Sequence, residues 1–313
     1  MVSISKKSLI LLTGATGFLG SHILDKLVIN GYNVAILKRS WSDTWRVNHL
    51  LDKIKTFDLD LISLEEIFQS IKPEYVIHLA TLYSKFDNDA DIDNTYKSNV
   101  TFPADLLEIG VKYGLKGFIN TGTFFEYDCT QQPINENNPI KPFNLYAQTK
   151  LDFELILKSY SEQININTFR IFSPYGERDN NKLIPMLIQK ALSNQTIQLS
   201  DGMQKLDFIY ALDVANAYID ALKVMLLKEN LKSYDVYNLG SGTPISVREI
   251  VSVVEQNLGE HINVVWGNPS TVDIPIAYAD LTKIKKELSW IPSYSIHEGL
   301  ANTIKYYRNK DIG

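Results

Sequence analysis

Tyr146 and Lys150 lie four residues apart in a segment with helical periodicity. On a helix, residues at this spacing project from the same face. An isolated phenol has a pKa of about 10 and is a poor proton donor near neutral pH. A lysine ammonium beside it would stabilise the phenolate and lower that pKa. The spacing therefore predicts a proton-transfer pair, although it also fits an exposed helix carrying an amphipathic pair.

A glycine-rich segment near the N-terminus predicts a phosphate-binding turn. An apolar run over residues 9–12 precedes Gly14, Gly17 and Gly20. The first glycine permits a tight turn, the second lets the backbone approach a pyrophosphate, and the third lets the next helix pack on the strand. A helix and a second strand over 33–37 are expected to follow. The unit predicts a dinucleotide site, although the glycines alone would also fit a bare structural turn.

Three polar residues follow this second strand, namely Lys38, Arg39 and Ser40. A site for NAD usually places an Asp or Glu here, which accepts a hydrogen bond from the ribose 2′-hydroxyl. An ammonium and a guanidinium instead suit the 2′-phosphate of NADP. The sequence thus predicts NADP (NADPH) as the cofactor, with NAD possible, unless these residues form only a solvated loop.

Composition and charge exclude several classes of protein. The chain has 313 residues, is 45% hydrophobic, carries a formal net charge of −5 and contains a single cysteine, Cys129. The negative charge disfavours nucleic acid as a partner, and one cysteine forms neither a disulfide framework nor a thiolate metal cage. No apolar run reaches the roughly 20 residues that span a bilayer, and no secretory signal is recognisable. We expect a soluble, cytoplasmic protein with no metal site and no membrane partner.

Strand and helix signals alternate along the first 172 residues. Further strands are expected over 55–57, 75–79, 117–120 and 167–172, and helices from Ser63 to Pro73, over 92–113 and over 146–163. This alternation predicts an α/β fold of Rossmann type, with a doubly wound parallel sheet that binds ligands beyond the carboxyl ends of its strands. We expect a dinucleotide-binding domain over 1–172 plus about 207–240. A smaller, interleaved α/β substrate domain should comprise about 173–206 and 241–313.

Further motifs are spread along nearly the whole chain. They are residues 13–20, Asp58, residues 78–81, Asn99, Thr123, Tyr146 with Lys150, residues 169–176, residues 207–210 with Asp213, and residues 237–240. Together they resemble the extended short-chain dehydrogenase/reductase superfamily, in its NAD(P)-dependent sugar epimerase/dehydratase group. The resemblance implies that Thr123, Tyr146 and Lys150 are catalytic. Aligning Glu126–Tyr127 with the Val-Tyr-Gly turn of the family places the catalytic hydroxyl at Thr123 rather than Thr121.

The resemblance, the glycine turn and the basic cluster together assign binding residues. Those expected at the cofactor are Gly14, Thr16, Gly17, Phe18, Leu19, Lys38, Arg39, Ser40, Asp58, Leu59, Leu79, Ala80, Thr81, Asn99, Thr121, Tyr146, Lys150 and Phe172. Those expected at the substrate are Tyr83, Thr123, Phe124, Phe125, Ser173, Arg178, Asn181, Lys182, Leu183 and Lys205. Asp58 is expected to contact adenine, unless it serves only as a cap before a helix. The resemblance also implies a homodimer formed through the helices near 92–113 and 146–163.

Within this group, several segments resemble bacterial reductases that make CDP-abequose and CDP-paratose. They are residues 77–81, 120–125, 181–185 and 192–195. Those enzymes reduce the 4-keto group of a nucleotide-linked 4-keto-6-deoxy sugar. A 4,6-dehydratase of the group carries an Asp-Glu pair directly after the catalytic threonine, where this chain has Phe124 and Phe125, whose phenyl groups cannot transfer protons. The sequence therefore predicts an NADPH-dependent 4-ketoreductase of deoxysugar and surface-polysaccharide biosynthesis, with a nucleotide-sugar epimerase as the alternative.

Two positions depart from the family pattern. Members commonly carry two arginines that clamp the substrate diphosphate, and here those positions hold Leu206 and Thr271. Because a bidentate arginine is a strong phosphate ligand, the departure leaves open a carbonyl substrate that is not a nucleotide sugar. Arg178, Lys182 or Lys205 could substitute. A dinucleotide-binding protein without turnover is a further alternative, which the intact catalytic pair disfavours.

Overall fold

Two compact units make up the chain. The computed structural model describes residues 8–83, 89–179, 182–269 and 274–310. The first unit contains the chain up to Asp128, Pro139–Ile171 and Ala215–Tyr237, and the second contains Cys129–Asn138, Phe172–Val214 and the chain from Asn238 onward. Within the described ranges, no helix is both long enough and apolar enough to cross a membrane.

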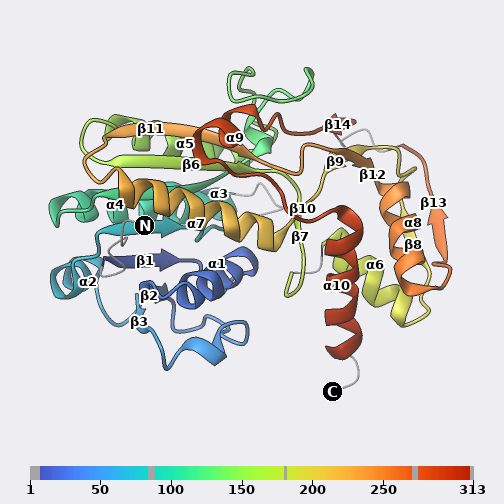
Figure 1. The fold of residues 1–313 in the computed structure, drawn as a ribbon, viewed down its shortest axis with the longest axis horizontal. Helices are drawn as coiled ribbons and strands as arrows, with labels where there is room; N and C mark the ends of the chain where they lie inside the picture. Colours follow the sequence, from blue (N-terminus) through green and yellow to red (C-terminus); the bar gives the residue numbers. More distant parts are fainter. Residues whose placement is uncertain (1–7, 84–88, 180–181, 270–273, 311–313) are drawn as a thin grey trace. The chain divides into compact units, whose positions relative to one another are not determined.

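The first unit is built on a seven-stranded sheet (Figure 1). Its strands are β1 (Leu9–Thr13), β2 (Asn33–Lys38), β3 (Lys55–Asp58), β4 (Tyr75–His78), β5 (Gly117–Thr123), β6 (Asn165–Ile171) and β11 (Ser233–Leu239). Their order in the sheet is β11-β6-β5-β4-β1-β2-β3, and every pairing from β6 to β3 is parallel. The predicted α/β fold with a parallel sheet of Rossmann type is confirmed.

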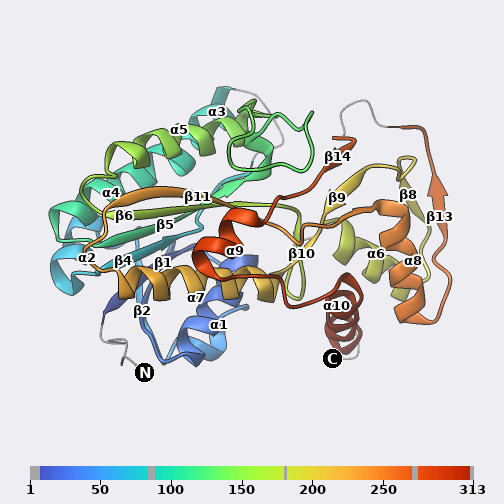
Figure 2. The ribbon, with the colours of Figure 1, turned by 45° about the horizontal axis from the view of Figure 1, so that its top comes forward.

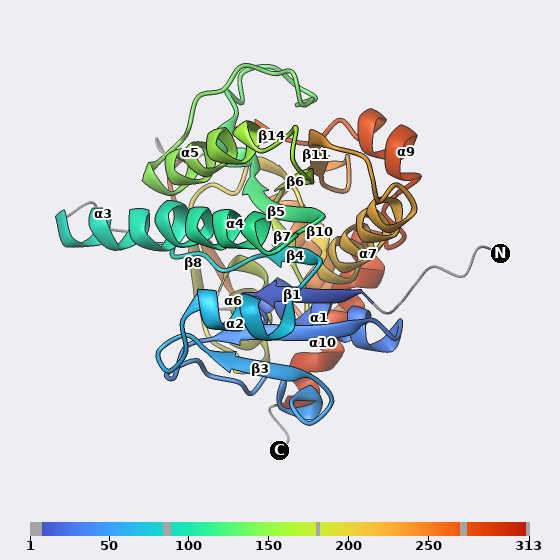
Figure 3. The same ribbon diagram turned by 90° about the vertical axis from the view of Figure 1, so that its left-hand side faces the viewer.

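Helices cover both faces of this sheet (Figures 2 and 3). They are α1 (Phe18–Ile29), α2 (Leu64–Ile71), α3 (Asp89–Tyr96), α4 (Phe102–Lys112), α5 (Leu145–Ser159) and α7 (Ala211–Leu227), with short 3-10 turns at Asn48–Leu50 and Phe124–Glu126. On one face α2, α4 and α5 pack side by side, and their apolar side chains share a buried cluster with alternate residues of the sheet. On the other face lie α1 and α7. Because the strands are buried from both sides, β1 and β4 are almost continuously apolar.

The helix predicted over 92–113 contains an irregular segment. A π-helical stretch, Lys97–Thr101, joins α3 to α4, and the N–H of Phe102 bonds the carbonyl of Lys97. Pro103 follows at the start of α4. Because proline has no N–H to donate, it interrupts the regular helical ladder at this point. The wider turn places the side chain of Asn99 in the interior, where it is 1% exposed.

Short strands and helices form the second unit. Its elements are β7 (Pro174–Tyr175), α6 (Leu183–Leu192), β8 (Ile197–Leu199), β9 (Lys205–Asp207), β10 (Ile209–Tyr210), β12 (Pro244–Ser246), α8 (Val247–Leu258), β13 (Val264–Trp266), β14 (Ile276–Ala277), α9 (Thr282–Leu288) and α10 (Ile296–Lys310). Apolar side chains of α6, α8 and α10 share one buried cluster. The Ser246–Glu249 capping box that begins α8 is present.

The return of the chain to the first unit begins at Ala215, later than the predicted 207. Asp207 belongs to the second unit because its carboxylate accepts hydrogen bonds from that unit's backbone. The donors are the N–H groups of Ser241 at 2.6 Å, Gly242 at 2.9 Å and Ala279 at 3.0 Å. These contacts hold β9 to the second unit.

Residues 129–138, expected in the first domain, also belong to the second unit. The N–H of Ile134 donates to the carbonyl of Tyr278 at 2.9 Å, and the N–H of Asp280 donates to the carbonyl of Ile134 at 2.7 Å. Periodicity could not reveal this placement, because the segment is an irregular loop whose partners lie far away in the sequence.

Candidate active site

The glycine turn between β1 and α1 brings backbone close to backbone. Gly14 has a φ of +69°, and a Cβ at this position would lie 2.6 Å from the backbone nitrogen of Ala80. A Cβ on Gly20 would overlap the carbonyl oxygen of Gly14. The N–H of Gly17 closes the turn on that same carbonyl at 3.0 Å. Side chains are thus excluded at Gly14 and Gly20. The N–H groups in the first turn of α1 have no partner within the helix and point toward a site for an anion.

Thr16, Phe18 and Leu19 lie in this turn and in the first turn of α1, as expected for contacts with a dinucleotide. The sequence interpretation missed Arg46, whose Nη1 donates to the carbonyl of Thr16 at 3.3 Å. The guanidinium of Arg46 also lies over the ring of Trp45, 4.4 Å from its centroid. Its place against the glycine turn makes Arg46 a candidate phosphate ligand, and the adjacent Trp-Arg pair was the signal that could have suggested it.

Thr13 ties the glycine turn to the end of β4. Its hydroxyl contacts Nδ1 of His78 at 2.8 Å and accepts hydrogen bonds from the N–H groups of Leu79 and Ala80, both at 3.2 Å. Burial keeps the pKa of His78 well below its ordinary value. His78 is therefore a neutral, packed residue that fixes the loop after β4.

The buried Asn99 fixes the next residues of that loop. Its side chain accepts from the Thr81 hydroxyl at 2.9 Å and from the Leu82 N–H at 2.8 Å, and donates to the Leu82 carbonyl at 2.9 Å and to the Thr149 hydroxyl at 3.1 Å. Four protein contacts occupy this amide. Asn99 thereby orders the loop containing Leu79, Ala80 and Thr81 beside α5.

The three expected catalytic residues come from β5 and α5. Thr123 ends β5, and Tyr146 and Lys150 lie on the first two turns of α5, which Asn144 caps through the Ala147 N–H at 2.9 Å. Nζ of Lys150 is 5.8 Å from the ring centroid of Tyr146. Lys150 is 2% exposed and Thr123 is 6% exposed. The predicted helical spacing therefore does place the lysine beside the phenol.

Neighbouring residues distinguish the two threonines of β5. The hydroxyl of Thr121 donates to the His78 carbonyl at 2.7 Å and contacts the Tyr218 hydroxyl at 2.6 Å. The Thr123 hydroxyl accepts a long bond, 3.3 Å, from the Phe125 N–H and caps the short 3-10 turn Phe124–Glu126. Tyr83, an expected substrate contact, packs its ring edge-to-face on Tyr146 with centroids 5.1 Å apart.

The pKa of Tyr146 departs from the expectation. Burial raises the pKa of this phenol above its ordinary value, and the negative charge of Glu126 raises it further. Burial also lowers the pKa of Lys150 to about 8, while the carboxylates of Glu126 and Glu154 oppose that shift. The sequence predicts a lowered pKa for Tyr146, but in this structure burial and the carboxylate of Glu126 raise that pKa overall.

Glu126, which the sequence interpretation treated only as part of a turn, belongs to a buried charge cluster. Its carboxylate accepts from the Thr123 N–H at 2.7 Å and pairs with Nε of Arg170 at 2.7 Å. Arg170 also pairs with Glu154 at 2.6 Å through Nη2, and Tyr234 donates to Glu154 at 3.1 Å. Burial and the neighbouring Glu154 raise the pKa of Glu126 well above its ordinary value. A glutamate in an otherwise apolar strand-end segment was the available signal.

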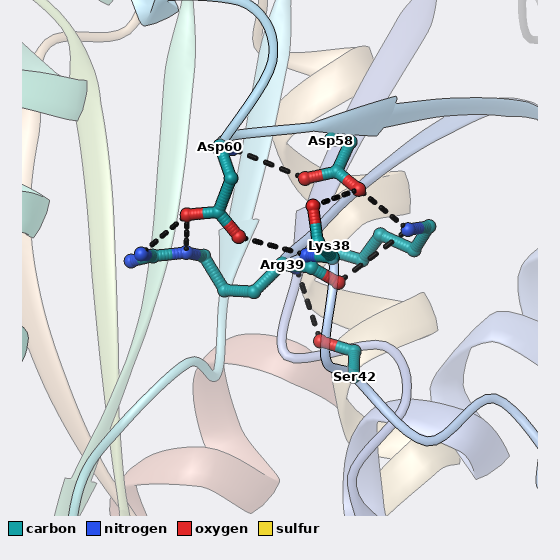
Figure 4. Close-up of polar contacts among 6 residues, drawn as sticks. Lys38, Arg39, Ser42, Asp58 and Asp60 are labelled. Atoms are coloured by element: carbon teal, nitrogen blue, oxygen red, sulfur yellow. Dashed lines mark hydrogen bonds and ion pairs between the residues drawn. The ribbon is translucent and has the colours of Figure 1, made fainter.

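Two ion pairs lie at the carboxyl ends of β2 and β3 (Figure 4). Nζ of Lys38 donates to Asp58 at 2.9 Å, and Nε of Arg39 donates to Asp60 at 2.6 Å. The Ser40 hydroxyl donates to Asp58 at 2.9 Å. Leu59 follows β3, and its N–H bonds the Lys38 carbonyl at 2.9 Å. Both cations expected at a 2′-phosphate thus already contact a carboxylate.

The residues after Thr123 form an aromatic wall. The rings of Phe124 and Phe125 are 4.3 Å apart, and Phe125 stacks on Phe143 at 5.4 Å. These side chains offer apolar contact and no titratable group beside the end of β5.

The remaining expected binding residues lie in the second unit. They are Phe172, Ser173, Arg178, Lys182, Leu183 and Lys205. Lys182 lies at the N-cap position of α6 without a capping hydrogen bond from its side chain, Arg178 has a φ of +64°, and Lys205 begins β9. Leu206 is partly buried and packs against the apolar cluster of this unit. Asn181 and Thr271 lie outside the described residues.

Comparisons with known proteins identify relatives that match nearly the whole chain. The sequence model of the NAD dependent epimerase/dehydratase family matches residues 10–240. A CDP-abequose synthase of Salmonella muenchen is 30% identical, over 96% of this chain and 97% of the relative. A UDP-glucose 4-epimerase of Bacillus subtilis is also 30% identical, over 95% of this chain and 96% of the relative. The solved UDP-glucose 4-epimerase of Thermotoga maritima, with UDP-glucose, matches with a TM-score of 0.86 and 27% identity, over 96% of this chain and 99% of that one.

Proposed function

Because the chain belongs to the NAD dependent epimerase/dehydratase family, we propose that this enzyme uses NADPH to reduce the 4-keto group of a nucleotide-linked 4-keto-6-deoxy sugar. The observation that carries the proposal is the combination of Thr123, Tyr146 and Lys150 with an aromatic wall directly after Thr123. The similarity to CDP-abequose synthase over nearly the whole chain supports a reductase. We also propose a homodimer formed through the helices near 92–113 and 146–163, which contain α3, α4 and α5; sedimentation showing a monomer would contradict it.

The residues of this site have distinct roles in the proposed reaction. A bound nicotinamide dinucleotide supplies the hydride. The Thr123 hydroxyl orients the substrate carbonyl, and Tyr146 donates a proton to its oxygen. The ammonium of Lys150 stabilises the phenolate that Tyr146 becomes. The Glu126 carboxylate accepts a hydrogen bond from the backbone N–H of Thr123. This bond fixes the backbone of Thr123 and thereby the position of its hydroxyl.

Dehydration finds no support among the residues at the end of β5. Elimination of water needs its own acid and base, and Phe124 and Phe125 supply neither. The next residue, Glu126, is buried and directed at the Thr123 N–H and Arg170. Its carboxylate therefore binds groups of the protein and is not directed at a substrate.

An epimerase is the second candidate, since the relatives from Bacillus subtilis and Thermotoga maritima carry that name. An epimerase must retain its oxidised cofactor, whereas a reductase must exchange the cofactor in every turnover. We therefore expect the purified protein to contain less than one dinucleotide per chain and to exchange it rapidly. Acid release followed by chromatography measures the content. Stoichiometric NAD that resists dialysis would favour the epimerase.

The rate of reduction should fall as the pH rises through about 8. Lys150, with a pKa of about 8, is charged below this pH and neutral above it. The neutral amine no longer stabilises the phenolate of Tyr146, whose own raised pKa keeps it protonated through this range. A profile of kcat against pH measures the fall. Residual activity of Lys150→Arg should lack it, because arginine stays charged; a flat wild-type profile to pH 10 would contradict the role of Lys150.

A further inference from the structure

We propose that Asp60 limits the selectivity of this enzyme for NADP over NAD, because its carboxylate occupies the donors that a ribose 2′-phosphate would use. The inference rests on the proposed function only in that a dinucleotide binds at the end of β2. Asp60 itself was not among the expected binding residues. It follows β3, and its side chain reaches across to the residues that follow β2 (Figure 4).

The contacts of Asp60 are those that a phosphate group would make. Oδ1 of Asp60 accepts from Nε of Arg39 at 2.6 Å and lies 2.5 Å from Nη2. Oδ2 accepts from the backbone N–H of Ser40 at 2.8 Å. A guanidinium fork plus a backbone N–H is a typical set of donors for a phosphate. One carboxylate of the protein therefore already fills an anion site that a 2′-phosphate would need.

A second carboxylate balances the remaining charge. Asp58 accepts from Nζ of Lys38 and from the Ser40 hydroxyl, both at 2.9 Å, and from the Asp60 N–H at 3.1 Å. The cluster of Lys38, Arg39, Asp58 and Asp60 thus contains two cations and two anions. The cationic end of β2 that the sequence suggested is electrostatically neutral.

The exposed fractions of the side chains indicate which ion pair, Lys38–Asp58 or Arg39–Asp60, can exchange a partner. Side chains of Lys38 and Asp58 are 23% and 14% exposed, whereas those of Arg39 and Asp60 are 52% and 27% exposed. An exposed ion pair contributes little stability, so an incoming phosphate can displace Asp60 from Arg39. The displaced carboxylate, however, still repels the phosphate from a short distance. A 2′-hydroxyl carries no charge and experiences no such repulsion.

Asp60→Asn tests the inference through binding alone. The amide keeps the shape and the acceptor for the Ser40 N–H, but removes the charge. Hydrogen bonding to Arg39 keeps the pKa of Asp60 below its ordinary value, so the wild-type residue is ionised at neutral pH. We expect Asp60→Asn to tighten NADPH binding about threefold to tenfold and to change NADH binding less than about twofold, as expected for loss of one exposed like charge. Isothermal titration calorimetry of the full chain gives both Kd values.

Two further variants make the result specific. Asp52→Asn makes the same charge change at an exposed residue just before β3, at the opposite end of that strand, and should alter neither Kd. Arg39→Ala combined with Asp60→Asn should bind NADPH more weakly than Asp60→Asn alone, because Arg39 supplies donors for the 2′-phosphate. Circular dichroism melts confirm that each variant folds.

The outcomes separate this inference from the proposed function. A gain for NADPH alone supports the inference. An equal gain for both cofactors, no gain, or weaker NADPH binding in Asp60→Asn would overturn it while leaving a dinucleotide enzyme intact. Failure of the wild type to bind either cofactor would overturn both this inference and the proposed function.

Discussion

Replacing Tyr146 with phenylalanine should lower kcat by about a hundredfold to ten-thousandfold, the range that general acid catalysis commonly contributes. The variant loses only the hydroxyl that donates the proton. Its ring should keep the edge-to-face contact with Tyr83 and its place beside Lys150. Dinucleotide affinity should therefore change less than about tenfold, since one neutral hydrogen bond contributes about 0.5–1.5 kcal/mol. Steady-state kinetics and calorimetric titration measure the two quantities.

Tyr113→Phe is the matched control for this experiment. Tyr113 follows α4, and its hydroxyl donates to Glu65 at 2.7 Å, remote from the carboxyl ends of the strands. This variant should keep wild-type kcat. If Tyr146→Phe also kept it, the protein would be a dinucleotide-binding sensor or an enzyme that uses another acid.

Replacing Arg170 with methionine should destabilise the protein by about 3–5 kcal/mol, the cost typical of removing one partner from a buried ion pair. Arg170 and its two partners, Glu126 and Glu154, have side chains no more than 5% exposed. Without the guanidinium, the two carboxylates face each other in the interior, where the Thr123 N–H and the Tyr234 phenol remain as donors. Urea unfolding, followed by circular dichroism, measures the change in the free energy of unfolding.

The charge of Glu126 can be removed separately. Glu126→Gln keeps the acceptor for the Thr123 N–H and leaves Arg170 paired with Glu154. It should cost less than Arg170→Met, and adding it to Arg170→Met should recover part of the lost stability, because one buried carboxylate disappears. An Arg170→Met variant within about 1 kcal/mol of wild type would contradict a charged, buried ion pair between Arg170 and these carboxylates.

The positions of the proposed catalytic residues could be predicted from local patterns. The glycines of the N-terminal turn predict a close approach of backbone to backbone, because a side chain would not fit at Gly14 or Gly20. The helical spacing of Tyr146 and Lys150 fixes their common face without knowledge of any other element. Parallel strands then bring the ends of β1, β4 and β5 to one edge of the sheet.

Partners supplied by other elements could not be predicted in the same way. In the sequence, Lys38 and Arg39 predict a cationic site at the end of β2. In the structure, Asp58 and Asp60, some twenty residues later, neutralise both charges. Glu126 resembles an ordinary turn residue until Arg170 on β6 and Glu154 on α5 enclose it. The pKa of Tyr146 was misjudged for the same reason, because burial and Glu126 arise only from the tertiary fold.

Turnover of NADPH tests the central claim most directly. The protein would be incubated with NADPH and, one at a time, CDP-, dTDP- and GDP-linked 4-keto-6-deoxy sugars, with absorbance recorded at the nicotinamide band and products examined by NMR. We predict that one of these sugars oxidises NADPH in equal amount and loses its 4-keto group. Isomerisation of a nucleotide sugar by the enzyme, without net oxidation of NADPH by any of the panel, would contradict a reductase and establish an epimerase.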